Sequence, residues 1–418
     1  MKIRVKKAEY SAVMARPMPK NRNPLKFIAP LRAIVALVAR VLMLPVGFHS
    51  VKKDLDKVDG PCLVLMNHSS FLDLEIAAAL CWRRPYSIVA TTDAFVGLGP
   101  ILRLIGCIPT QKFVTDMALL SHMAHALRKN KADVIMFPEA GYSFDGTATA
   151  LPRKLGVVLK KLDVPVVHIQ TWGAYARQPL YNMLKLRKVK VSAEMSCLLT
   201  REQVRTMSVQ ELDAALDRAF SFDQWAWQRE NQVRITEPDR AEGLERVLYQ
   251  CPVCGAEGHM KGAGTGLTCG ACGARWELDE YGVLQGDRNP YPHVPDWYAW
   301  QRSQVRQQLE AGTYALDLPV KIGLLRDTSA LYMVGEGRLT HGPEGFALTG
   351  CGGLQYAQGP RASHTVNSDF YWYQIDDVIG IGDRNCQYFC FPQIPTPVAK
   401  VRLAAEELYK MNKRKANL

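Results

Sequence analysis

The middle of the chain alternates short apolar runs with stretches of helical periodicity. Between about Pro61 and Cys197, the apolar runs have the length of buried strands, and the longer stretches repeat apolar residues every three or four positions. The expected strands are Leu63–Met66, Tyr86–Ala90, Asp133–Phe137 and Val164–Gln170, and the expected helices are Leu72–Leu80, Ala94–Ile105, Met117–Arg128 and Lys154–Leu162. Such alternation is typical of an α/β layer, so we predict a mostly parallel sheet flanked by helices.

The pattern changes after this layer. Lys188–Leu199 has the character of a closing strand, and the periodicity of Thr200–Leu248 predicts helices, with Thr200 and Ser208 as candidate caps. The last third of the chain has short β-type runs separated by Gly, Asn and Asp, and a helix is expected from Val398 to about Met411.

This C-terminal part carries a weak resemblance of its own. Gly337–Thr340, Gly345–Phe346 and Tyr371–Val378 resemble segments of a pleckstrin-homology or GRAM-like sandwich, which would imply binding of lipid or peptide. The alternative is a small β-rich domain that packs against the rest of the chain.

The changes of pattern divide the chain into five segments. A length of 418 residues predicts two to four domains. The expected segments are a basic N-terminal segment with an amphipathic helix (1–50), the α/β core (51–200), a helical extension (201–248), a Cys-rich segment (249–284) and a β-rich C-terminal domain ending in a helix (285–418).

The most apolar early stretch, Phe27–Phe48, is interrupted by prolines and by Arg32 and Arg40. The run between the two arginines is seven residues, well short of the ~20 that cross a bilayer as a helix. Both arginines fall on one helical face, opposite an apolar face, which suits a helix lying in a membrane interface. The alternative is a helix packed on the protein's own core. No signal peptide is expected, because no apolar segment with a cleavage site follows the basic opening residues.

Charge and cysteine content narrow the class of protein. The apolar share of 48% is ordinary for a globular protein and argues against wholesale disorder. The net charge of +12 favours anionic partners, such as lipid headgroups, an acidic carrier protein or cofactor, or nucleic acid. Four of the eleven cysteines form two C-x-x-C pairs and the others lack framework spacing, which indicates a reducing compartment with one metal site.

The two C-x-x-C pairs predict a zinc ribbon. The four ligands are Cys251, Cys254, Cys269 and Cys272. A glycine after each pair permits the left-handed turn that lets backbone amides face the thiolates, and four thiolates leave no open position on structural Zn²⁺. Nucleic acid is an unlikely partner because acidic residues make this segment locally unbasic, so we expect a structural or docking role.

A candidate catalytic pair, His68 and Asp73, follows the first expected strand. Five residues along a continuous helix would turn the two side chains roughly 140° apart. His68 must therefore lie in the strand-to-helix turn for Asp73, one turn into the helix, to reach its ring. There, Asp73 would fix the imidazole and His68 would remove a proton from a hydroxyl. The alternative is a capping box, S-x-x-D, formed by Ser70 and Asp73.

Three sequence blocks in order carry a family resemblance. They are N-H-x-x-x-x-D at Asn67–Asp73, F-P-E at the start of Phe137–Ser143, and the apolar V-P-V-V at Val164–Val167. Together they resemble the glycerolipid acyltransferase family of lysophosphatidic acid acyltransferases (PlsC-type), over roughly residues 25–200. The family's G-x-I-F-I-D-R block is echoed by Gly106–Lys112.

The resemblance implies a set of acceptor-binding residues. They are Asn67, Lys112, Glu139, Gly141, Ser143 and Lys154. Glu139 would help to hold the acceptor near the base, and Lys112 stands where the family places a phosphate-binding arginine. Ala140, Gly141 and Tyr142 replace the family's G-T-R, so a second arginine is absent. Arg153 and Lys154 are candidate substitutes, because arginine and lysine differ in how they grip phosphate but both bind it.

The resemblance implies an acyltransferase, similar to 1-acylglycerol-3-phosphate O-acyltransferases. It would move a fatty acyl group from acyl-CoA or acyl carrier protein to a hydroxyl of a lysophospholipid-like acceptor, as in phospholipid biosynthesis. We expect a peripheral or monotopic location at the cytoplasmic face of the membrane. The alternative is a catalytically silent lipid-binding or tethering protein on the same fold.

Overall fold

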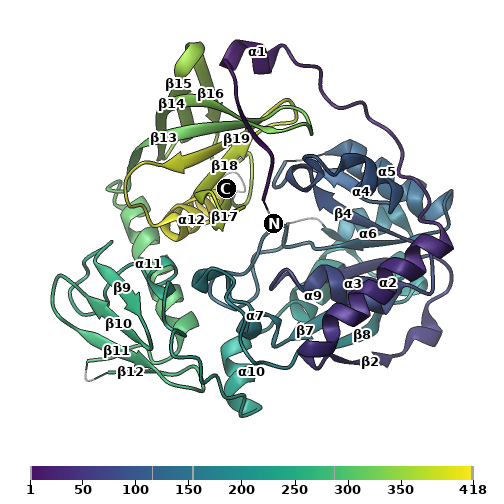
Figure 1. Cartoon of the computed structure of the whole chain (residues 1–418), viewed down its shortest axis with the longest axis horizontal. Helices are drawn as coiled ribbons and strands as arrows, with labels where there is room; N and C mark the ends of the chain where they lie inside the picture. The colour runs from purple at the N-terminus through teal and green to yellow at the C-terminus, as the bar shows by residue number, and fades with distance from the viewer. Residues whose placement is uncertain (1, 115, 153–154, 287, 416–418) are drawn as a thin grey trace.

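A seven-stranded sheet forms the centre of the first half of the chain. The computed structural model describes residues 2–114, 116–152, 155–286 and 288–415 (Figure 1). Parallel pairing joins β7-β3-β6-β4-β5, whereas β8 runs antiparallel to β7 and carries β2 parallel to itself at the edge. The strands are β2 (His49–Lys53), β3 (Leu63–Met66), β4 (Tyr86–Thr91), β5 (Ile108–Thr110), β6 (Asp133–Met136), β7 (Val166–Trp172) and β8 (Ser192–Leu199). The sheet is therefore mixed, with helices on both faces.

The central strand β3 shows why both faces are covered. Its four side chains are fully buried and alternate between two cores. Val64 and Met66 pack with α2 (Ala29–Met43) and α3 (Asp73–Cys81). Leu63 and Leu65 pack on the other face, against α5 (Met117–Arg128), α6 (Leu155–Leu162) and α9 (Val209–Ala219). A continuous apolar run is what a strand buried on both sides requires.

Local chemistry explains where the expected and observed elements differ. One helix was expected over Ala94–Ile105, but the chain forms the 3₁₀ turn η3 (Thr92–Phe95) and the helix α4 (Gly99–Leu104). Gly97, with φ of 75°, breaks the helix between them. Strand β2 is not predicted by the apolar pattern, because all five of its residues are exposed and it contains no apolar run.

The helical extension is shorter than its periodicity predicts. It contains α8 (Arg201–Thr206), α9 and α10 (Gln224–Glu230), followed by irregular chain up to η5 (Leu244–Arg246). Thr200 and Ser208 each form a reciprocal capping box with the side chain three residues later, which confirms both caps. The helices end where Gln232 adopts a left-handed conformation, with φ of 51°.

The Cys-rich segment folds into a four-stranded antiparallel sheet of its own. The strand order is β12-β11-β10-β9. The strands are β9 (Met260–Ala263), β10 (Gly266–Cys269), β11 (Arg275–Leu278) and β12 (Leu284–Gln285). The long helix α11 (Val294–Glu310) follows, and the indole of Trp297 donates to the carbonyl of Gln250 at 2.9 Å. The ribbon is thereby anchored to α11.

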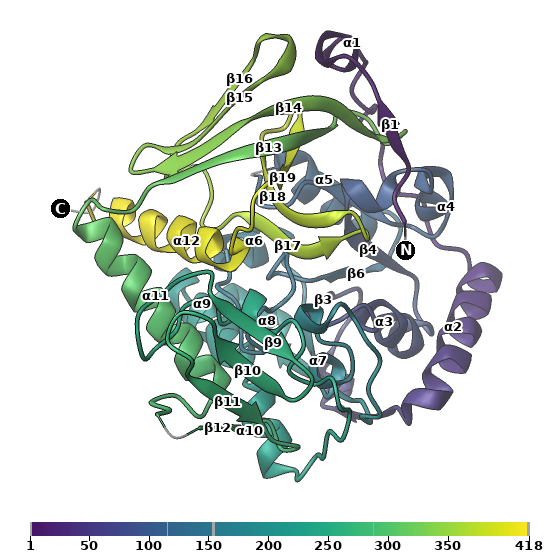
Figure 2. The same ribbon diagram turned by 60° about the vertical axis from the view of Figure 1, so that its left-hand side comes forward.

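The C-terminal module, residues 314–415, is a curved antiparallel sheet closed by a helix (Figure 2). Its order is β16-β15-β14-β13-β19-β18-β17, so β13 joins a four-strand meander to a three-strand meander. The elements are β13 (Leu316–Leu325), β14 (Leu331–Gly342), β15 (Gly345–Gly350), β16 (Leu354–Gln358), β17 (Asn367–Trp372), β18 (Asp376–Gly382), β19 (Gln387–Pro392) and α12 (Val398–Lys415). The β-rich domain is present, and its likeness to a pleckstrin-homology or GRAM fold stays a prediction.

The N-terminus reaches across to this module. Strand β1 (Val5–Lys7) pairs in parallel with β14, and the short helix α1 (Tyr10–Met14) follows it. Arg16 forms an ion pair with Asp327 at 2.6 Å. The first residues of the chain thus lie on the C-terminal module, whereas α2 lies on the seven-stranded sheet (Figure 1).

Helix α2 buries Arg32 against the domain and turns its apolar residues outward, and Arg40 contacts the domain while it stays exposed. Arg32 is 8% exposed and donates to the carbonyls of Trp82 and Phe27, while Arg40 lies over the Trp82 ring. The outer side chains are each more than half exposed: Ile34, Leu37, Val38, Val41 and Leu42. In the described part of the chain, Ala29–Val46 is the one helical stretch long and apolar enough to cross a membrane. The apolar face is therefore not packed on the protein's own core.

Candidate active site

His68 lies in the turn between β3 and α3, where it meets Asp73. Its Nδ1 is 2.9 Å from Oδ2 of Asp73, the first residue of α3. Asp73 is fully buried, whereas the His68 side chain is 17% exposed. A carboxylate bound to Nδ1 holds the proton on that nitrogen and leaves Nε2 with its lone pair. The turn thus gives the geometry that the five-residue spacing predicts.

The same carboxylate also organises the start of the helix. Oδ2 of Asp73 accepts hydrogen bonds from the backbone amides of Ser69 at 2.7 Å and Ser70 at 3.1 Å. The Ser70 hydroxyl accepts from the amide of Leu72, so the reciprocal bond of a capping box to Asp73 is not made. Asp73 therefore combines half of the capping interaction with its contact to the imidazole.

Two aromatic rings sandwich the imidazole of His68. The ring centroid of Phe137 is 4.4 Å away and that of Tyr142 is 4.1 Å away, both tilted by about 30°. Phe71 extends this group, at 5.3 Å from Tyr142. The rings keep water from the imidazole faces, which strengthens the polar contacts at its edge. Tyr142 stands where the resemblance places an arginine.

Glu139 hydrogen-bonds to the backbone of the base and to Thr149. It is 2% exposed, and its Oε1 accepts from the backbone amide of His68 at 3.1 Å. Its Oε2 accepts from the amide and hydroxyl of Thr149, at 3.0 and 2.6 Å. Burial raises the pKa of Glu139 to about 7, although these hydrogen bonds oppose the shift. In this structure, Glu139 fixes the His68 turn.

Asn67 and Ser143 also hold the backbone around His68 in place. Oδ1 of Asn67 accepts from the amide of Thr171 at 2.8 Å, which ties the end of β3 to β7. The amide of Ser143 donates to the carbonyl of His68 at 3.3 Å, and its hydroxyl donates to the carbonyl of Thr147. Both side chains are buried. The backbone of His68 is thus held on both sides by residues 139–143.

None of the remaining expected residues is found in contact with His68 in the described part of the chain. Lys112 lines a small cavity between the loop after β5 and the C-terminal module. A Cβ on Gly141 would lie 3.5 Å from Nη2 of Arg402 and 3.7 Å from the Phe113 ring. Lys154 and its neighbour Arg153 lie outside the described residues. Arg402, on α12, was not predicted, because it lies 260 residues from the loop that it contacts.

Four cysteine sulfurs form a site that could hold a metal ion. The Sγ atoms of Cys251, Cys254, Cys269 and Cys272 all lie within 4.8 Å of one another. Sulfurs of opposite knuckles are 3.7 and 3.8 Å apart, which matches the ~3.8 Å edge of a tetrahedron with Zn–S bonds of about 2.3 Å. Gly255 and Gly273 both have φ of 75°, as expected for the two knuckles. Zinc as the ion stays a prediction.

The comparison with known proteins agrees with this site. Residues 48–171 match the family model described as Acyltransferase. This acyltransferase-like segment contains His68, Asp73 and Glu139. A 1-acyl-sn-glycerol-3-phosphate acyltransferase of Brassica napus (BAT2, chloroplastic) is 28% identical over 125 residues, which cover 29% of this chain and 36% of that relative. The chain thus spans about a third of the length of the curated relative that it matches.

One solved structure is also similar. It is the 1-acyl-sn-glycerophosphate (LPA) acyltransferase PlsC of Thermotoga maritima, at 17% identity and a TM-score of 0.34. The match covers 46% of this chain and 78% of the other.

Glu139 gives a pH dependence of stability with a defined sign. Between its ordinary pKa of 4.5 and about 7, the unfolded chain releases the proton that the folded protein retains. Folded stability therefore falls as pH rises through this window, by up to about 3 kcal/mol from this group. Urea unfolding from pH 4.5 to 8 should show this fall in the wild type relative to Glu139→Gln, since all other groups are shared. Parallel stability curves would contradict the assignment.

The cysteine cluster predicts one zinc ion per chain. We expect metal analysis of the purified protein to find about one equivalent of zinc, and Cys254→Ser to lose most of it. Cys254→Ser should also lower the thermal midpoint, whereas Cys197→Ser, a half-buried cysteine outside the cluster, should retain the metal. A wild-type protein without metal would rule the zinc site out.

Proposed function

We propose that this protein transfers a fatty acyl group from acyl-CoA or acyl carrier protein to a hydroxyl of a lysophospholipid-like acceptor. The observation that carries the proposal is the contact between His68 and the buried carboxylate of Asp73, in a turn that leaves Nε2 of His68 as the base. The acyltransferase match and the activity for which the Brassica relative is named support a glycerolipid acceptor.

The proposed reaction needs no protein nucleophile. Nε2 of His68 takes the proton of the acceptor hydroxyl while that oxygen attacks the thioester carbonyl. The tetrahedral intermediate collapses to the ester, the C–S bond breaks, and the thiolate leaves and receives the proton from His68. Asp73 stabilises the imidazolium between these steps, as an orienting carboxylate does in other acyl-transfer sites.

The residues of the site constrain the identity of the acceptor less than they constrain the reaction. Lys112 can meet a phosphate as a point charge, whereas Tyr142 offers a single donor where an arginine would bind bidentately. Lysophosphatidic acid is therefore one candidate acceptor, and a different lysolipid is another. A catalytically silent lipid-binding protein is the second candidate function, favoured by the stacking of Tyr142 on the base.

The decisive assay uses labelled acyl donor with a panel of lysolipids. We expect diacyl product with at least one acceptor, and a fall in rate of at least about 10³-fold for His68→Ala, because the base is lost. Asp73→Asn should fall by a similar factor without loss of folded protein. His122→Ala, which removes a buried histidine on α5, serves as the control. Equal inactivity of wild type and His68→Ala, with lipid binding intact, would favour the tethering function.

We also propose that the protein lies on the cytoplasmic face of the membrane through α2. The support is the row of exposed apolar side chains on this helix, whose arginines are used for packing against the domain. Such a face buries apolar area in the headgroup region without crossing the bilayer. The net charge of +12 adds attraction to anionic lipid.

Vesicle co-sedimentation tests this placement. With vesicles of phosphatidylglycerol and phosphatidylethanolamine, the double variant Leu37→Asp/Val41→Asp should bind at least about tenfold more weakly, because two charges would enter the apolar region. Leu186→Asp changes an equally exposed leucine outside α2 and should bind as the wild type does. Unchanged binding by the double variant would contradict the role of α2.

A further inference from the structure

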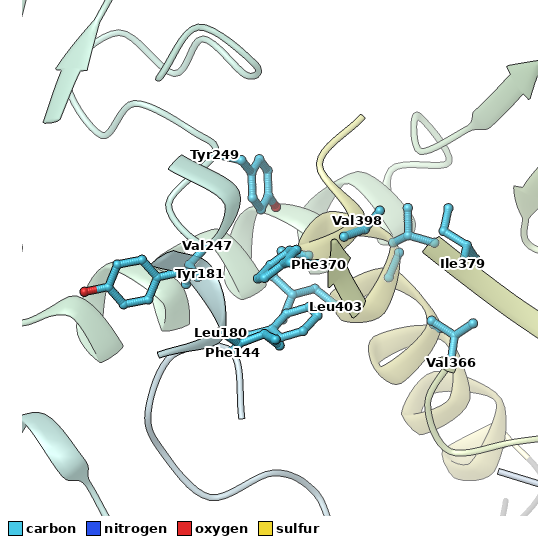
Figure 3. Close-up of a cluster of buried hydrophobic side chains, with 14 of the residues drawn as sticks. Phe144, Leu180, Tyr181, Val247, Tyr249, Val366, Phe370, Ile379, Val398 and Leu403 are labelled. Atoms are coloured by element: carbon cyan, nitrogen blue, oxygen red, sulfur yellow. The ribbon is translucent and has the colours of Figure 1, made fainter. Parts of the chain in front are cut away.

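The C-terminal module shares its core with the acyltransferase domain. One cluster of buried side chains runs from the ribbon and the module to Phe144, in the loop that follows β6 (Figure 3). The ring of Phe144 stacks on Phe370 of β17, with centroids 4.2 Å apart and an angle of 22°. Leu403 of α12 belongs to the same cluster. The loop that carries the F-P-E block is therefore packed against the C-terminal module.

Arg402 of α12 makes the polar part of this contact. It is 6% exposed, and its Nη1 donates to the carbonyl of Tyr142 at 3.0 Å. Nε and Nη2 donate to the hydroxyl and carbonyl of Ser368, at 3.0 and 2.9 Å. The guanidinium carbon lies 3.6 Å from the centroid of the Phe144 ring. Arg402 thus connects residues 142–144 to strand β17 through these contacts.

This contact leads directly to the base. The carbonyl of Tyr142 is bound by Arg402, and the ring of the same residue lies 4.1 Å from the imidazole of His68. The next amide, that of Ser143, donates to the carbonyl of His68. A shift of the Tyr142 backbone would therefore move the ring that covers one face of the imidazole.

The module also contacts a second loop at the same edge of the sheet, the one that follows β4. The hydroxyl of Tyr373 donates to Asp93 at 3.1 Å, and Thr92 donates to the side chain of Gln387 at 3.1 Å. Val96 is 7% exposed and lies in a cluster formed mainly by the module. These loops follow β4 and β6, so the module covers the carboxyl ends of the parallel strands, where sites form in such sheets.

We propose that Arg402 is a positioning residue of the acyl-transfer site, which holds loop 140–144 so that Tyr142 stays against the ring of His68. The C-terminal module is then a working part of the active site and not an independent binding unit. The proposal rests on the proposed function in one respect, namely that His68 is the base. A planar fork that binds three acceptors and stacks on a ring is specific to arginine, so lysine should replace it poorly.

Chemical modification of histidine tests the contact without turnover. Full-length wild type, Arg402→Gln and Arg402→Lys are treated with diethyl pyrocarbonate, and the rate for each histidine is read from peptide masses. His68 should react at least about fivefold faster in Arg402→Gln, because the loop opens locally. His341, buried within the module and bonded to Tyr314, should stay unreactive. Lys410→Gln removes a charge from the exposed side of the same helix and should match the wild type.

Activity then separates positioning from simple stability. We expect kcat to fall about 10- to 100-fold in Arg402→Gln, with a smaller change in KM, since the base is misplaced and the bound substrate is not. Tyr142→Leu should expose His68 similarly, and Arg402→Gln/Tyr142→Leu should be no worse than the more damaging single variant.

Three results would overturn the proposal. They are an unchanged His68 rate in Arg402→Gln, a parallel rise at His341, which would mean that the module unfolds, and additive effects in the double variant. If the wild type is inactive toward every lysolipid while the modification rates follow the expected pattern, the proposed function fails and the positioning contact stands.

Discussion

The buried carboxylate of Asp73 is the interaction on which the site depends. A carboxylate removed from water costs several kcal/mol unless donors surround it. Here, one oxygen accepts from the imidazole of His68 and from the amides of Ser69 and Ser70. These three donors reach a single oxygen only if the chain turns sharply between β3 and α3. The path of the turn, and with it the position of the base, follows from bringing these three donors to one oxygen, whereas the buried Oδ1 of the same carboxylate has no hydrogen-bond partner among the described residues.

The loop after β6 is also positioned by hydrogen bonds to a buried carboxyl group. Glu139 is a second buried carboxyl group, and it too is surrounded by donors, from His68 and Thr149. Because β3 and β6 are neighbours in the sheet, their loops emerge side by side at one edge. The imidazole is thus held by side chains from the segments that follow two neighbouring strands. The polar residues of the sequence blocks, Asn67 and Ser143 included, mainly hold the backbone around the base.

This explains how much the sequence could predict. The apolar runs found the buried strands, and helical geometry placed His68 in the turn, because both depend on residues close in the chain. The identity of a residue in a motif does not reveal its protein partners, so the hydrogen bonds of Glu139 to His68 and Thr149 could not be predicted from the sequence. The role of Arg402 could not be predicted from the sequence for a related reason, because its contact with Tyr142 joins two residues that are 260 positions apart. The outward orientation of the apolar face of α2 also depends on a residue distant in the sequence, because Arg32 and Arg40 of this helix both contact Trp82.

The uncharged residue at position 142, after the F-P-E block, and the presence of the C-terminal module are physically linked. An arginine at position 142 would add a second guanidinium to a residue whose own carbonyl is already bound by Arg402. Two cations in this buried loop would repel each other, and the carboxylates that act on this position, Asp73, Asp93 and Asp369 among them, would have to offset that repulsion. Tyrosine avoids that cost, because its ring covers the imidazole without adding charge. An uncharged residue at position 142 is thus compatible with the arginine that α12 brings to the carbonyl of the same residue.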